Sequence, residues 1–403
     1  NCSEVQTMSN NNKTPAIRFK GFTDTWEQRE VGETYNVTRG YVLAAPKTSP
    51  IKTDEMPYPV YSSQTKDEGL MGYYNEYLYE NAITWTTDGA NAGTVNYRAG
   101  KFYCTNVCGL LLSDKGYANK AAAEALNMIA WKWVSHVGNP KLMNNVMAGI
   151  EISLPPTLQE QDKISEFLES LDTFITLHQR KCDKLIQFKA AMLQKMFPQN
   201  GADKPEIRFK GFTDAWEQRK CSDFIKLVGG ATPSKANKDY WDGDIVWLSS
   251  QEIKGGFVSK GTYNITQKAV DDNTTKMIPA NTPMFISRSG ILANSFPITR
   301  ALCDVAINQD IKALLFDHTV FSNDYIVHYL ESKEQFILKS IVKSGTTVQS
   351  VSIPDFEKMP INIPASKDEQ DRIGIYFENL DTLITLHQRK CDKYKSIKAG
   401  LIR

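Results

Sequence analysis

Two short groups of side chains have the residue types that metal binding or phosphodiester cleavage would use. Cys104 and Cys108 are separated by three residues, but a zinc site needs a second Cys or His pair at a suitable spacing, and the sequence offers none. The PDFEK segment that begins at Pro354 has the acidic and lysine residues of a restriction nuclease without the separation that places them around a metal. We therefore predict no catalytic residue and no metal site, and we expect Cys104 and Cys108 to be buried thiols.

Other catalytic motifs are missing from the sequence. There is no GxxxxGK[ST] and no GxGxxG after a strand, the two patterns that hold nucleotide phosphates. Asn139-Pro140 is followed by Lys141, whereas the base-flipping loop of a DNA amino-methyltransferase requires a second proline and an aromatic residue. The five histidines are scattered and form no Ser/His/Asp arrangement. The sequence thus disfavours catalysis by this chain.

Composition sets broad limits on the class of protein. The chain has 403 residues, with 47 basic and 46 acidic side chains, a balance that predicts neither a strong nucleic-acid field nor an acidic disordered tail. Seven cysteines, sparse and odd in number, favour reduced thiols in the cytoplasm. No apolar run approaches the roughly 18 residues of a membrane span. We expect a cytoplasmic protein with two or more domains that does not contact a membrane.

Two stretches occur twice and divide the chain into duplicated halves. LDTFITLHQRKCDK begins at Leu171 and returns with one change at Leu380, while PAIRFKGFTDTWEQRE begins at Pro15 and returns as PEIRFKGFTDAWEQRK at Pro205. The first pair is offset by 209 residues (380 − 171) and the second by 190 (205 − 15), a period far too long for a solenoid. The chain is therefore predicted to hold two copies of a whole domain.

The segments between the repeats are predicted to form domains of mixed strands and helices. In residues 31–154, YPVYSSQ, AITWTT and KFYCTNVCGLLL are typical of strands, and ANKAAAEALNMIAWKWVSHV from Ala118 is typical of a helix. In residues 221–363, DIVWLSSQEI and the run from Val305 to Phe316 are typical of strands, and FSNDYIVHYLESKEQFILKSIV of a helix. The segments agree in outline and differ in residues, so we expect one fold with two different surfaces.

A coiled-coil pattern follows each of these segments. From about Thr157 the apolar positions alternate four and three residues apart, which predicts a helix of about 40 residues and roughly 60 Å that ends at Pro198. We expect the two helices to pair antiparallel, with Phe167, Phe174 and Phe188 widening the first stripe. The expected seam positions are Ile164, Leu168, Leu171, Ile175, His178, Cys182, Leu185, Lys189, Met192 and Met196, then Ile373, Phe377, Leu380, Ile384, His387, Cys391, Tyr394 and Leu401.

A histidine occupies the same seam position in both predicted helices. We expect His178 and His387 to fix the register of the pair or to contact a partner, because polar seam residues commonly do so. A solvated seam position, a metal ligand and a catalytic role are the alternatives.

Taken together, these motifs resemble those of a specificity subunit of a type I DNA restriction-modification enzyme. The residues that carry the resemblance are Trp26-Glu27-Gln28-Arg29 and Trp216-Glu217-Gln218-Arg219, the P-x4-E-Q-D-x-I sequences from Pro155 to Ile164 and from Pro364 to Ile373, and the two ITLHQRK helices. They cover essentially the whole chain. One departure is that the second helix stops at Arg403 whereas the first continues to KMFP, so we expect its end to be shorter or less well packed.

The resemblance implies a fold and a domain plan. The expected fold is mixed α/β (α+β), with two similar target-recognition domains separated by two long helices that form an antiparallel coiled coil with internal pseudo-twofold duplication. The expected parts are residues 15–156 and 205–364 for the target-recognition domains, and residues 157–199 and 365–403 for the long helices.

The resemblance also implies a function and partners. A member of this family is a non-catalytic subunit that recognises a bipartite double-stranded DNA target, one half-site per domain, and docks two methyltransferase subunits and restriction (endonuclease and translocase) subunits. S-adenosylmethionine, ATP and Mg are expected on those partner subunits and no cofactor on this chain. Two different readers on a stiff helix pair should read half-sites at a fixed separation.

Base recognition requires donors and acceptors on loops at strand ends. In the first domain we predict DNA contacts from Ser62, Ser63, Gln64, Lys66, Thr87, Asn91 and Arg98. In the second we predict them from Ser249, Ser250, Gln251, Arg288, Ser289, Lys343, Ser344, Thr346, Thr347 and Gln349. The alternative for any one of them is an ordinary turn. Neither segment is basic: residues 31–154 hold ten Lys/Arg and eleven Asp/Glu, and residues 221–363 hold fourteen and fifteen.

The repeated helix stretch is predicted to have two roles. Its apolar seam meets the other helix, and its Gln-Arg-Lys face docks partner subunits or is simply solvated. The residues assigned to pairing and docking are Leu171, Ile175, His178, Arg180, Lys181, Cys182, Leu380, Ile384, His387, Arg389, Lys390 and Cys391. Two competing interpretations are a coiled-coil scaffold whose two domains bind carbohydrate or peptide, and a nuclease with an unfamiliar site.

Overall fold

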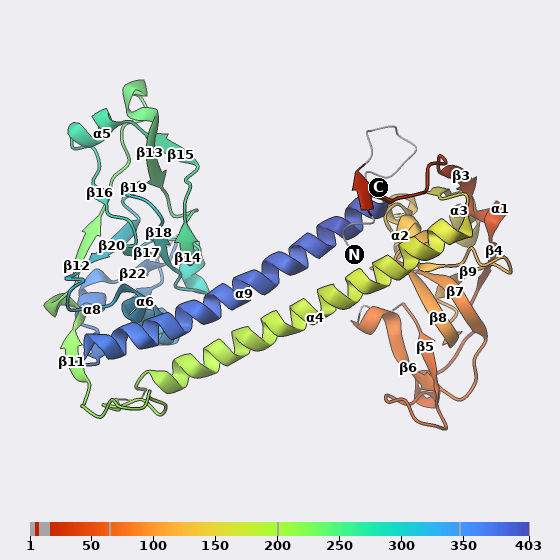
Figure 1. Ribbon diagram of the computed structural model, residues 1–403, viewed down its shortest axis with the longest axis horizontal. Helices are drawn as coiled ribbons and strands as arrows, with labels where there is room; N and C mark the ends of the chain where they lie inside the picture. The colour runs from red at the N-terminus through yellow and green to blue at the C-terminus, as the bar shows by residue number, and fades with distance from the viewer. Residues whose placement is uncertain (1–4, 8–16, 64–65, 200, 346–347, 403) are drawn as a thin grey trace. The chain divides into compact units, whose positions relative to one another are not determined.

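The computed structural model describes residues 5–7, 17–63, 66–199, 201–345 and 348–402. They fall into two units, which are described separately (Figure 1). The first unit comprises the described parts of residues 1–180 and 388–403, and the second comprises those of residues 181–387. Among the described residues, no helix has the length and apolar character needed to cross a membrane.

The first unit is built on a six-stranded sheet with the order β4-β9-β7-β8-β5-β6. All neighbours are antiparallel except β5 and β8, which run parallel. Two-stranded sheets pair β1 with β2 and β3 with β10. The strands are β1 Val5–Thr7, β2 Ile17–Phe19, β3 Glu27–Glu30, β4 Asn36–Arg39, β5 Tyr58–Tyr61, β6 Leu70–Tyr74, β7 Tyr79–Thr86, β8 Val95–Cys104, β9 Cys108–Leu112 and β10 Glu151–Leu154.

Short helices complete this unit and cover its core, where Trp85, Leu111, Leu126 and Met147 are buried together. They are α1 Val31–Thr34, α2 Lys120–Asn127 and α3 Asn144–Ala148, with single turns η2 Ala45–Lys47, η3 Lys66–Gly69 and η4 Ala130–Trp133. The start of α2 is capped by Asn119, whose side chain accepts a hydrogen bond from the backbone N–H of Ala122.

The helix expected from Ala118 through residue 137 is wrong beyond Asn127. The buried face of α2 is formed by its alanines and Leu126, and the chain then makes the η4 turn, in which Trp131 and Trp133 are exposed. A helix cannot gain packing energy from apolar residues that face water. The apolar spacing of this stretch therefore included two tryptophans that face water, although Ala130 and Val134 beside them are buried in the core.

The second unit contains a five-stranded sheet, β12-β20-β17-β18-β14, and a four-stranded sheet, β15-β13-β19-β16, together with the pairs β11-β23 and β21-β22. The strands are β11 Glu217–Lys220, β12 Lys226–Gly229, β13 Trp241–Leu248, β14 Gly256–Val258, β15 Tyr263–Ile265, β16 Met277–Ile278, β17 Pro283–Ile286, β18 Ile298–Ala301, β19 Val305–Ile307, β20 Ile311–Leu315, β21 Val342–Lys343, β22 Ser350–Val351 and β23 Pro360–Ile363. The single strand expected from Val305 to Phe316 is thus two strands, because a turn at residues 308–310 sends β20 into the other sheet.

The helix expected in FSNDYIVHYLESKEQFILKSIV forms with an interruption at Lys333, whose φ of −100° and ψ of 6° leave the helical range. The helical elements of this unit are α5 Gln267–Asp271, α6 Asn323–Ser332, α7 Glu334–Phe336, the π-helical turn η8 Ile337–Ile341 and α8 Ile353–Glu357, with single turns η5 Cys221–Asp223, η6 Lys238–Tyr240 and η7 Gly290–Ala293. Phe197, Tyr325 and Phe377 meet in its core, with ring centroids 5.5 to 5.6 Å apart around Phe197.

The two units share a strand plan, as the sequence predicted. In the first unit β9 pairs with β4 and β7, and β7 with β8. In the second, β20 pairs with β12 and β17, and β17 with β18. A parallel pair adds to each plan, β5 with β8 and β13 with β19. The duplication therefore extends through segments whose sequences agree only in outline.

The two long helices are α4 Leu158–Met196 and α9 Lys367–Ile402, and each has residues in both units. They run antiparallel where they pack together (Figure 1). In the first unit Lys398 Nζ lies 2.7 Å from Asp172 Oδ1. In the second Lys189 Nζ lies 2.7 Å from Asp381 Oδ2. The 209-residue offset relates one contact to the other, so the same ion pair is made twice.

The seam positions divide by burial. Leu168, Leu171 and Cys182 of α4 are buried, as are Phe377 and Cys391 of α9. The expectation that Phe174 and Phe188 widen the stripe is wrong for burial, since both are nearly half exposed. Phe174 instead stacks on Tyr394 at a centroid distance of 5.4 Å, at the margin of the seam.

Candidate nucleic-acid interface

The shared motif at the start of each half is bound to the start of the long helix that follows that half. Arg18 of β2 donates from Nε and Nη2 to Glu160 of α4 at 2.6 and 2.8 Å, and both side chains are 1% exposed. Arg208 makes the same two bonds to Glu369 of α9, at 2.6 and 2.8 Å. Such a bidentate pair fixes orientation as well as distance. The P-x-I-R-F-K-G motif, which holds the arginine, and the P-x4-E-Q-D-x-I motif, which holds the glutamate, are therefore the two sides of one repeated joint.

The W-E-x-R sequences contribute to the same joint. Trp26 and Trp216 are buried, while Arg29 and Arg219 pair with the glutamate two residues earlier in their own strands. The strands β3 and β11 pair antiparallel with β10 and β23, the last strands before the long helices. The W-E-x-R motif thus brings the two ends of each variable segment together.

Four predicted DNA-contacting residues of the first unit gather at one edge of its sheet. Thr105 donates from its N–H to Tyr61 O, at the end of β5, and from Oγ1 to Ser62 Oγ at 3.1 Å. Asn91 Nδ2 donates to Ser63 O at 3.4 Å.

Thr87, which follows β7, donates from Oγ1 to Val107 O at 3.0 Å. The ends of β5 and β7 therefore meet at the turn between β8 and β9. Gln64 and the side chain of Lys66 lie outside the described residues.

Arg98 lies beneath this edge, at the wall of a cavity of about 270 Å³ that Ser62 and Asn91 also line. Its side chain is 6% exposed, its guanidinium carbon is 3.8 Å from the centroid of the Tyr61 ring, and Nη2 donates to Glu68 O at 2.6 Å. Burial lowers the pKa of Arg98, and the opposing effects of Tyr61 and of the Glu68 carboxylate do not cancel it; that carboxylate is 4.0 Å away and 83% exposed. The small exposed part of Arg98 thus adjoins this cavity.

The Cys104 and Cys108 thiols are buried and unbridged beside that cavity. Burial raises the pKa of Cys104, and a hydrogen bond between the two thiols lowers that of Cys108. They close the turn between β8 and β9, where Gly40 N–H donates to Cys108 O and Tyr41 N–H to Cys104 O. The two cysteines therefore lie in the buried layer under the loops and help to fix the turn between β8 and β9.

The second unit places its predicted residues at the corresponding edge. The turn at residues 308–310 is hydrogen-bonded to the end of β13, since Asn308 N–H donates to Leu248 O at 3.0 Å. It is also hydrogen-bonded to the residue after β17, since Ser287 donates from N–H and Oγ to Asp310 O at 2.7 and 3.0 Å. Ser249, Ser250 and Gln251 follow β13 directly, as Ser62 and Ser63 follow β5.

The cationic candidates of the second unit are joined by backbone pairing. Arg288 pairs with Ser350 of β22, and Ser289 N–H donates to Gln349 O at 3.1 Å. Arg288 is exposed, and Lys343 is 56% exposed with Nζ 3.4 Å from Asp355. Ser350 pairs with both Arg288 and Lys343, so the two ends of the 343–350 loop lie close to Arg288. Ser344 is exposed, and Thr346 and Thr347 lie outside the described residues.

Ser249 is already engaged within its own loop. Its Oγ and N–H donate to Glu252 at 2.7 and 2.8 Å. Burial opposes ionisation of Glu252, but hydrogen bonds from Thr262 and Ser249 hold its pKa below the usual value. Ser249 therefore shapes the loop, whereas Gln251 is exposed.

The residues assigned to pairing and docking separate into two faces. Leu171, His178, Cys182, Leu380 and Cys391 are buried. The Sγ atoms of Cys182 and Cys391 lie 3.9 and 4.0 Å from Ile384 O and Ile175 O, which are equivalent contacts on opposite helices. Ile175, Ile384 and His387 are half-buried, whereas Arg180, Lys181, Arg389 and Lys390 are exposed.

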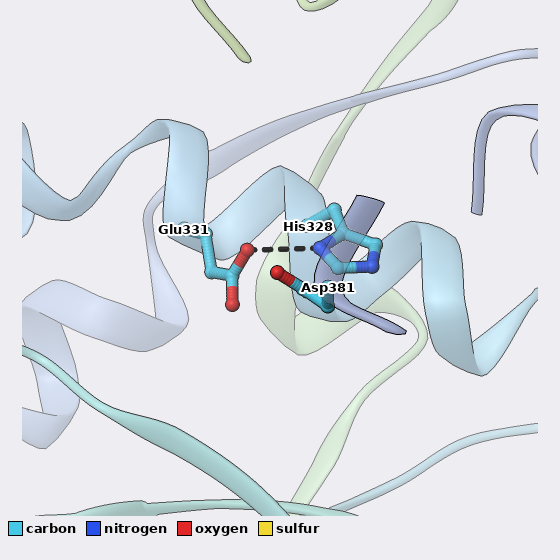
Figure 2. Close-up of side chains that lie close together, drawn as sticks. All are labelled: His328, Glu331 and Asp381. Atoms are coloured by element: carbon cyan, nitrogen blue, oxygen red, sulfur yellow. Dashed lines mark hydrogen bonds and ion pairs between the residues drawn. The ribbon is translucent and has the colours of Figure 1, made fainter. Parts of the chain in front are cut away.

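A charged cluster between α6 and the long helices was missed by sequence reasoning. Figure 2 shows His328 and Glu331 of α6 facing Asp381 of α9, with His328 Nδ1 2.8 Å from Glu331 Oε2. The three groups have the composition of a metal site, but Lys189 Nζ lies 2.9 Å from Glu331 and 2.7 Å from Asp381. The lysine ammonium supplies the cation that the carboxylates require, so this cluster ties the recognition domain to the helices.

Comparison with known proteins decides the family. Residues 23–187 and 213–395 each match the family model described as the type I restriction modification DNA specificity domain. The chain belongs to this specificity family. The sequence resemblance and the mixed fold with two similar domains and two long antiparallel helices are thereby confirmed.

Two curated specificity subunits illustrate the relationship. A type I restriction enzyme specificity subunit of Escherichia coli is 30% identical over 193 residues, which is 45% of this chain and 47% of the relative. A putative type I specificity subunit of Mycoplasma pneumoniae is 27% identical over 331 residues, 80% of this chain and 81% of the relative. The first match thus spans about half the length of that relative, and the second spans most of it.

Solved structures share the specificity-subunit fold. The S subunit of a type I restriction-modification system from M. genitalium is similar with a TM-score of 0.69 and 14% identity, over 96% of this chain and 98% of that one. A chain from a study of complex assembly and conformational transition in a type I system has a TM-score of 0.51 and 13% identity, over 94% and 96% of the two chains. At this identity the similarity concerns the fold.

Proposed function

We propose that the chain reads a bipartite double-stranded DNA target for a type I restriction-modification complex, one half-site by each unit. The observation that carries this proposal is that the same sheet edge, built with the same backbone hydrogen bonds, carries different side chains in the two units. Thr87 and Ser287 occupy one backbone position, yet the residues that follow are Asp88 and Arg288. One scaffold with two different edges suits two different half-sites.

The chemistry of each edge suits a different kind of base recognition. The second unit exposes Arg288 and Lys343, and an arginine can donate two hydrogen bonds to guanine O6 and N7. The first unit offers the neutral donors and acceptors of Ser62, Ser63 and Asn91, and an asparagine can pair with adenine N6 and N7. Which bases are read depends on the approach of the duplex to these edges.

The partners are proposed to do the chemistry that this chain lacks. Two methyltransferase subunits would dock on the exposed Arg-Lys faces of α4 and α9, using S-adenosylmethionine, and restriction subunits would add ATP- and Mg-dependent cleavage. The exposure of Arg180, Lys181, Arg389 and Lys390 supports such docking, and their repetition supports a pair of identical partners.

Methylation mapping tests the proposal directly. A genome is sequenced with modified-base detection after this chain is expressed with its methyltransferase. We expect one bipartite motif with a fixed gap, and modification that disappears when this chain is omitted. A continuous motif, or unchanged methylation without this chain, would contradict the proposal.

Copurification separates the proposal from its competitors. We expect two methyltransferase copies per chain in a purified complex. Sugar or peptide retained by the chain instead of DNA would support a scaffold, and metal-dependent DNA cutting by the chain alone would support a nuclease.

A further inference from the structure

A small hairpin lies beside the predicted reading edge of the first unit, in a stretch most of which was expected to be helical. Ser135 N–H donates to Lys141 O at 2.8 Å, and Lys141 N–H donates to Ser135 O at 3.0 Å. Gly138 has a φ of +78°, a left-handed conformation that favours glycine, and so makes the turn. With the preceding η4 turn, residues 131–141 form a compact element that we call the 131–141 hairpin.

The 131–141 hairpin is joined to the loop after β7 by backbone hydrogen bonds. Leu142 N–H donates to Thr87 O at 2.8 Å, and Gly89 N–H donates to Pro140 O at 3.0 Å. Between these bonds, Asp88 pairs with Lys141 as a β-bridge. The hairpin is therefore continuous with the Thr87–Asn91 loop.

The second unit contains the same junction with other residues. Val351 N–H donates to Ser287 O at 2.8 Å, Ser289 N–H donates to Gln349 O at 3.1 Å, and Arg288 pairs with Ser350. Donor, acceptor and order along the chain agree with the first unit at all three contacts. The 131–141 hairpin thus joins its sheet edge at the position where the second unit has Gln349 and Ser350, the last residues of the 343–350 loop, of which Gln349 was predicted to contact DNA.

The surface of the 131–141 hairpin is unusual for a soluble protein. Trp131, Trp133 and Val137 are 61%, 52% and 92% exposed. Exposed large apolar side chains that lie close together commonly mark a binding site. The hairpin also carries Lys132 and Lys141 and no acidic residue of its own, and Lys141 Nζ lies 3.6 Å from the Asp88 carboxylate of the adjoining loop. An apolar tip with a basic flank suits a nucleic acid better than a purely apolar protein surface.

The core anchors of the hairpin are not its exposed side chains, of which Trp131 makes one local hydrogen bond, from Nε1 to Met128 O at 3.0 Å. Val134 and Leu142 anchor it in the core at 8% and 0% exposure, and Trp85 Nε1 donates to Leu142 O at 3.0 Å. The scaffold is therefore separate from the surface that it presents. Substitutions at Trp131, Lys132 or Trp133 should leave the fold intact.

We propose that the 131–141 hairpin is a second DNA-contacting element of the first unit, which enters a groove of the half-site read by that unit. This inference rests on the proposed function. Trp131, Trp133 and Val137 would contact thymine methyl groups or wedge against a base step. Lys132 would contact backbone phosphate. The occupant is duplex DNA, in line with the equivalent 343–350 loop.

The test uses the complex of this chain with its methyltransferase, and synthetic duplexes that carry the mapped target or a base change in either half-site. The Trp131→Ala/Trp133→Ala variant should bind the intact target about tenfold or more weakly. It should also lose discrimination at the half-site of the first unit and keep it at the other. Lys132→Ala should lower the slope of log affinity against log salt by about 1.

Matched controls separate this effect from general damage. Lys115 is exposed just beyond the end of β9 that lies away from the turn between β8 and β9, so Lys115→Ala should leave affinity and salt slope unchanged. The far-ultraviolet circular dichroism and melting temperature of the tryptophan variant should match the wild type.

The possible results are distinct. Full discrimination at both half-sites in the tryptophan variant would overturn the inference and leave the proposed function standing. Loss of methyltransferase binding with DNA discrimination retained would also overturn it and assign the hairpin to a protein contact. If the wild-type complex itself does not distinguish target from altered duplex, the proposed function fails together with the inference.

Discussion

At the scale of single residues, the reading edges combine side chains that shape loops with side chains that project from them. The hydroxyl groups of Thr87, Ser249 and Ser287 donate hydrogen bonds to neighbouring backbone or carboxylate oxygens. Arg288 and Gln251 are exposed at the same edges. Variants of the first kind should damage loop geometry, and variants of the second kind should change recognition alone.

Arg288 is the clearest residue of the second kind. Arg288→Ala should weaken specific binding by about 1 to 3 kcal/mol if the guanidinium contacts a base, with relaxed discrimination at the half-site of the second unit. Lys226→Ala is a suitable control, because Lys226 is exposed and pairs with Leu315 at the end of β20 away from the 308–310 turn. Fluorescence anisotropy at fixed salt measures both. Equal affinities of Arg288→Ala and wild type would remove Arg288 from the interface.

The cluster in Figure 2 predicts a pH dependence of stability. Burial opposes the charge on Glu331, but His328 and Lys189 outweigh it and lower the pKa of Glu331 to about 2. A carboxyl with a depressed folded pKa stabilises the fold above its unfolded pKa of roughly 4.3. That stabilisation is lost as pH falls through the folded pKa, so the window lies between these two values.

Glu331→Gln removes this contribution. The variant should be less stable than wild type at neutral pH, and the difference should shrink as pH falls from roughly 4.3 towards the folded pKa of about 2. His328 works with the opposite sign. Burial lowers its pKa, but Glu331 and Glu378 raise it to a net increase, so its contribution is complete below the unfolded pKa and is lost as pH rises through the folded one. Urea unfolding across pH measures both. A difference that stays constant from neutral to acid pH would contradict the assignment for Glu331.

At the scale of elements, α4 and α9 present a buried seam and an exposed charged face. The seam followed from sequence because heptad spacing is a property of neighbouring residues. Lys189 was correctly placed on it, but its acidic partners were not foreseen, since Glu331 comes from a different element. The 131–141 hairpin was missed because its tryptophans were assigned to a helix. The Gly138-Asn139-Pro140 turn beside two tryptophans was the available signal.

The exposed helix faces give the docking prediction. Arg180→Glu together with Arg389→Glu reverses the charge of both faces, which lie outside the buried seam. We expect loss of methyltransferase assembly with little change in melting temperature. Glu166→Lys, another exposed charge reversal on α4, serves as the control. Size-exclusion chromatography with light scattering gives the stoichiometry, and an intact assembly of the double variant would identify these faces as merely solvated.

At the scale of the whole molecule, features that depend on local sequence patterns were predicted well, and contacts between distant segments were predicted poorly. The duplication, the long helices and most strands came from repeats and periodicity. The turn at residues 308–310 and the bidentate pairs of Arg18 and Arg208 did not, since they depend on residues far apart in the chain. The predicted DNA-contacting residues converged on one edge per unit because strand ends meet there, although Arg98 proved to be buried below that edge.

Net charge is also a property of the whole chain. With 47 basic and 46 acidic side chains, the chain has no large net positive charge to attract DNA, so we expect its binding to be weak without partners. We expect the methyltransferase complex to bind the target far more tightly and with a steeper salt dependence than the chain alone. Titrations from 50 to 200 mM salt compare the two. Equal affinity and equal slope would show that the chain supplies the electrostatic contacts itself.

The repeated joint of Arg18 with Glu160 and of Arg208 with Glu369 has a consequence for how such a protein changes over generations. The variable segment of each half lies between the W-E-x-R motif and the glutamate of the joint, whereas the arginine, tryptophan and glutamate themselves are the same in both halves. A foreign segment inserted between that tryptophan and that glutamate would meet the same arginine, glutamate and tryptophan that its predecessor met. We therefore expect that one variable segment can be exchanged for another without disturbing the joint, and that the exchange would alter recognition of one half-site alone.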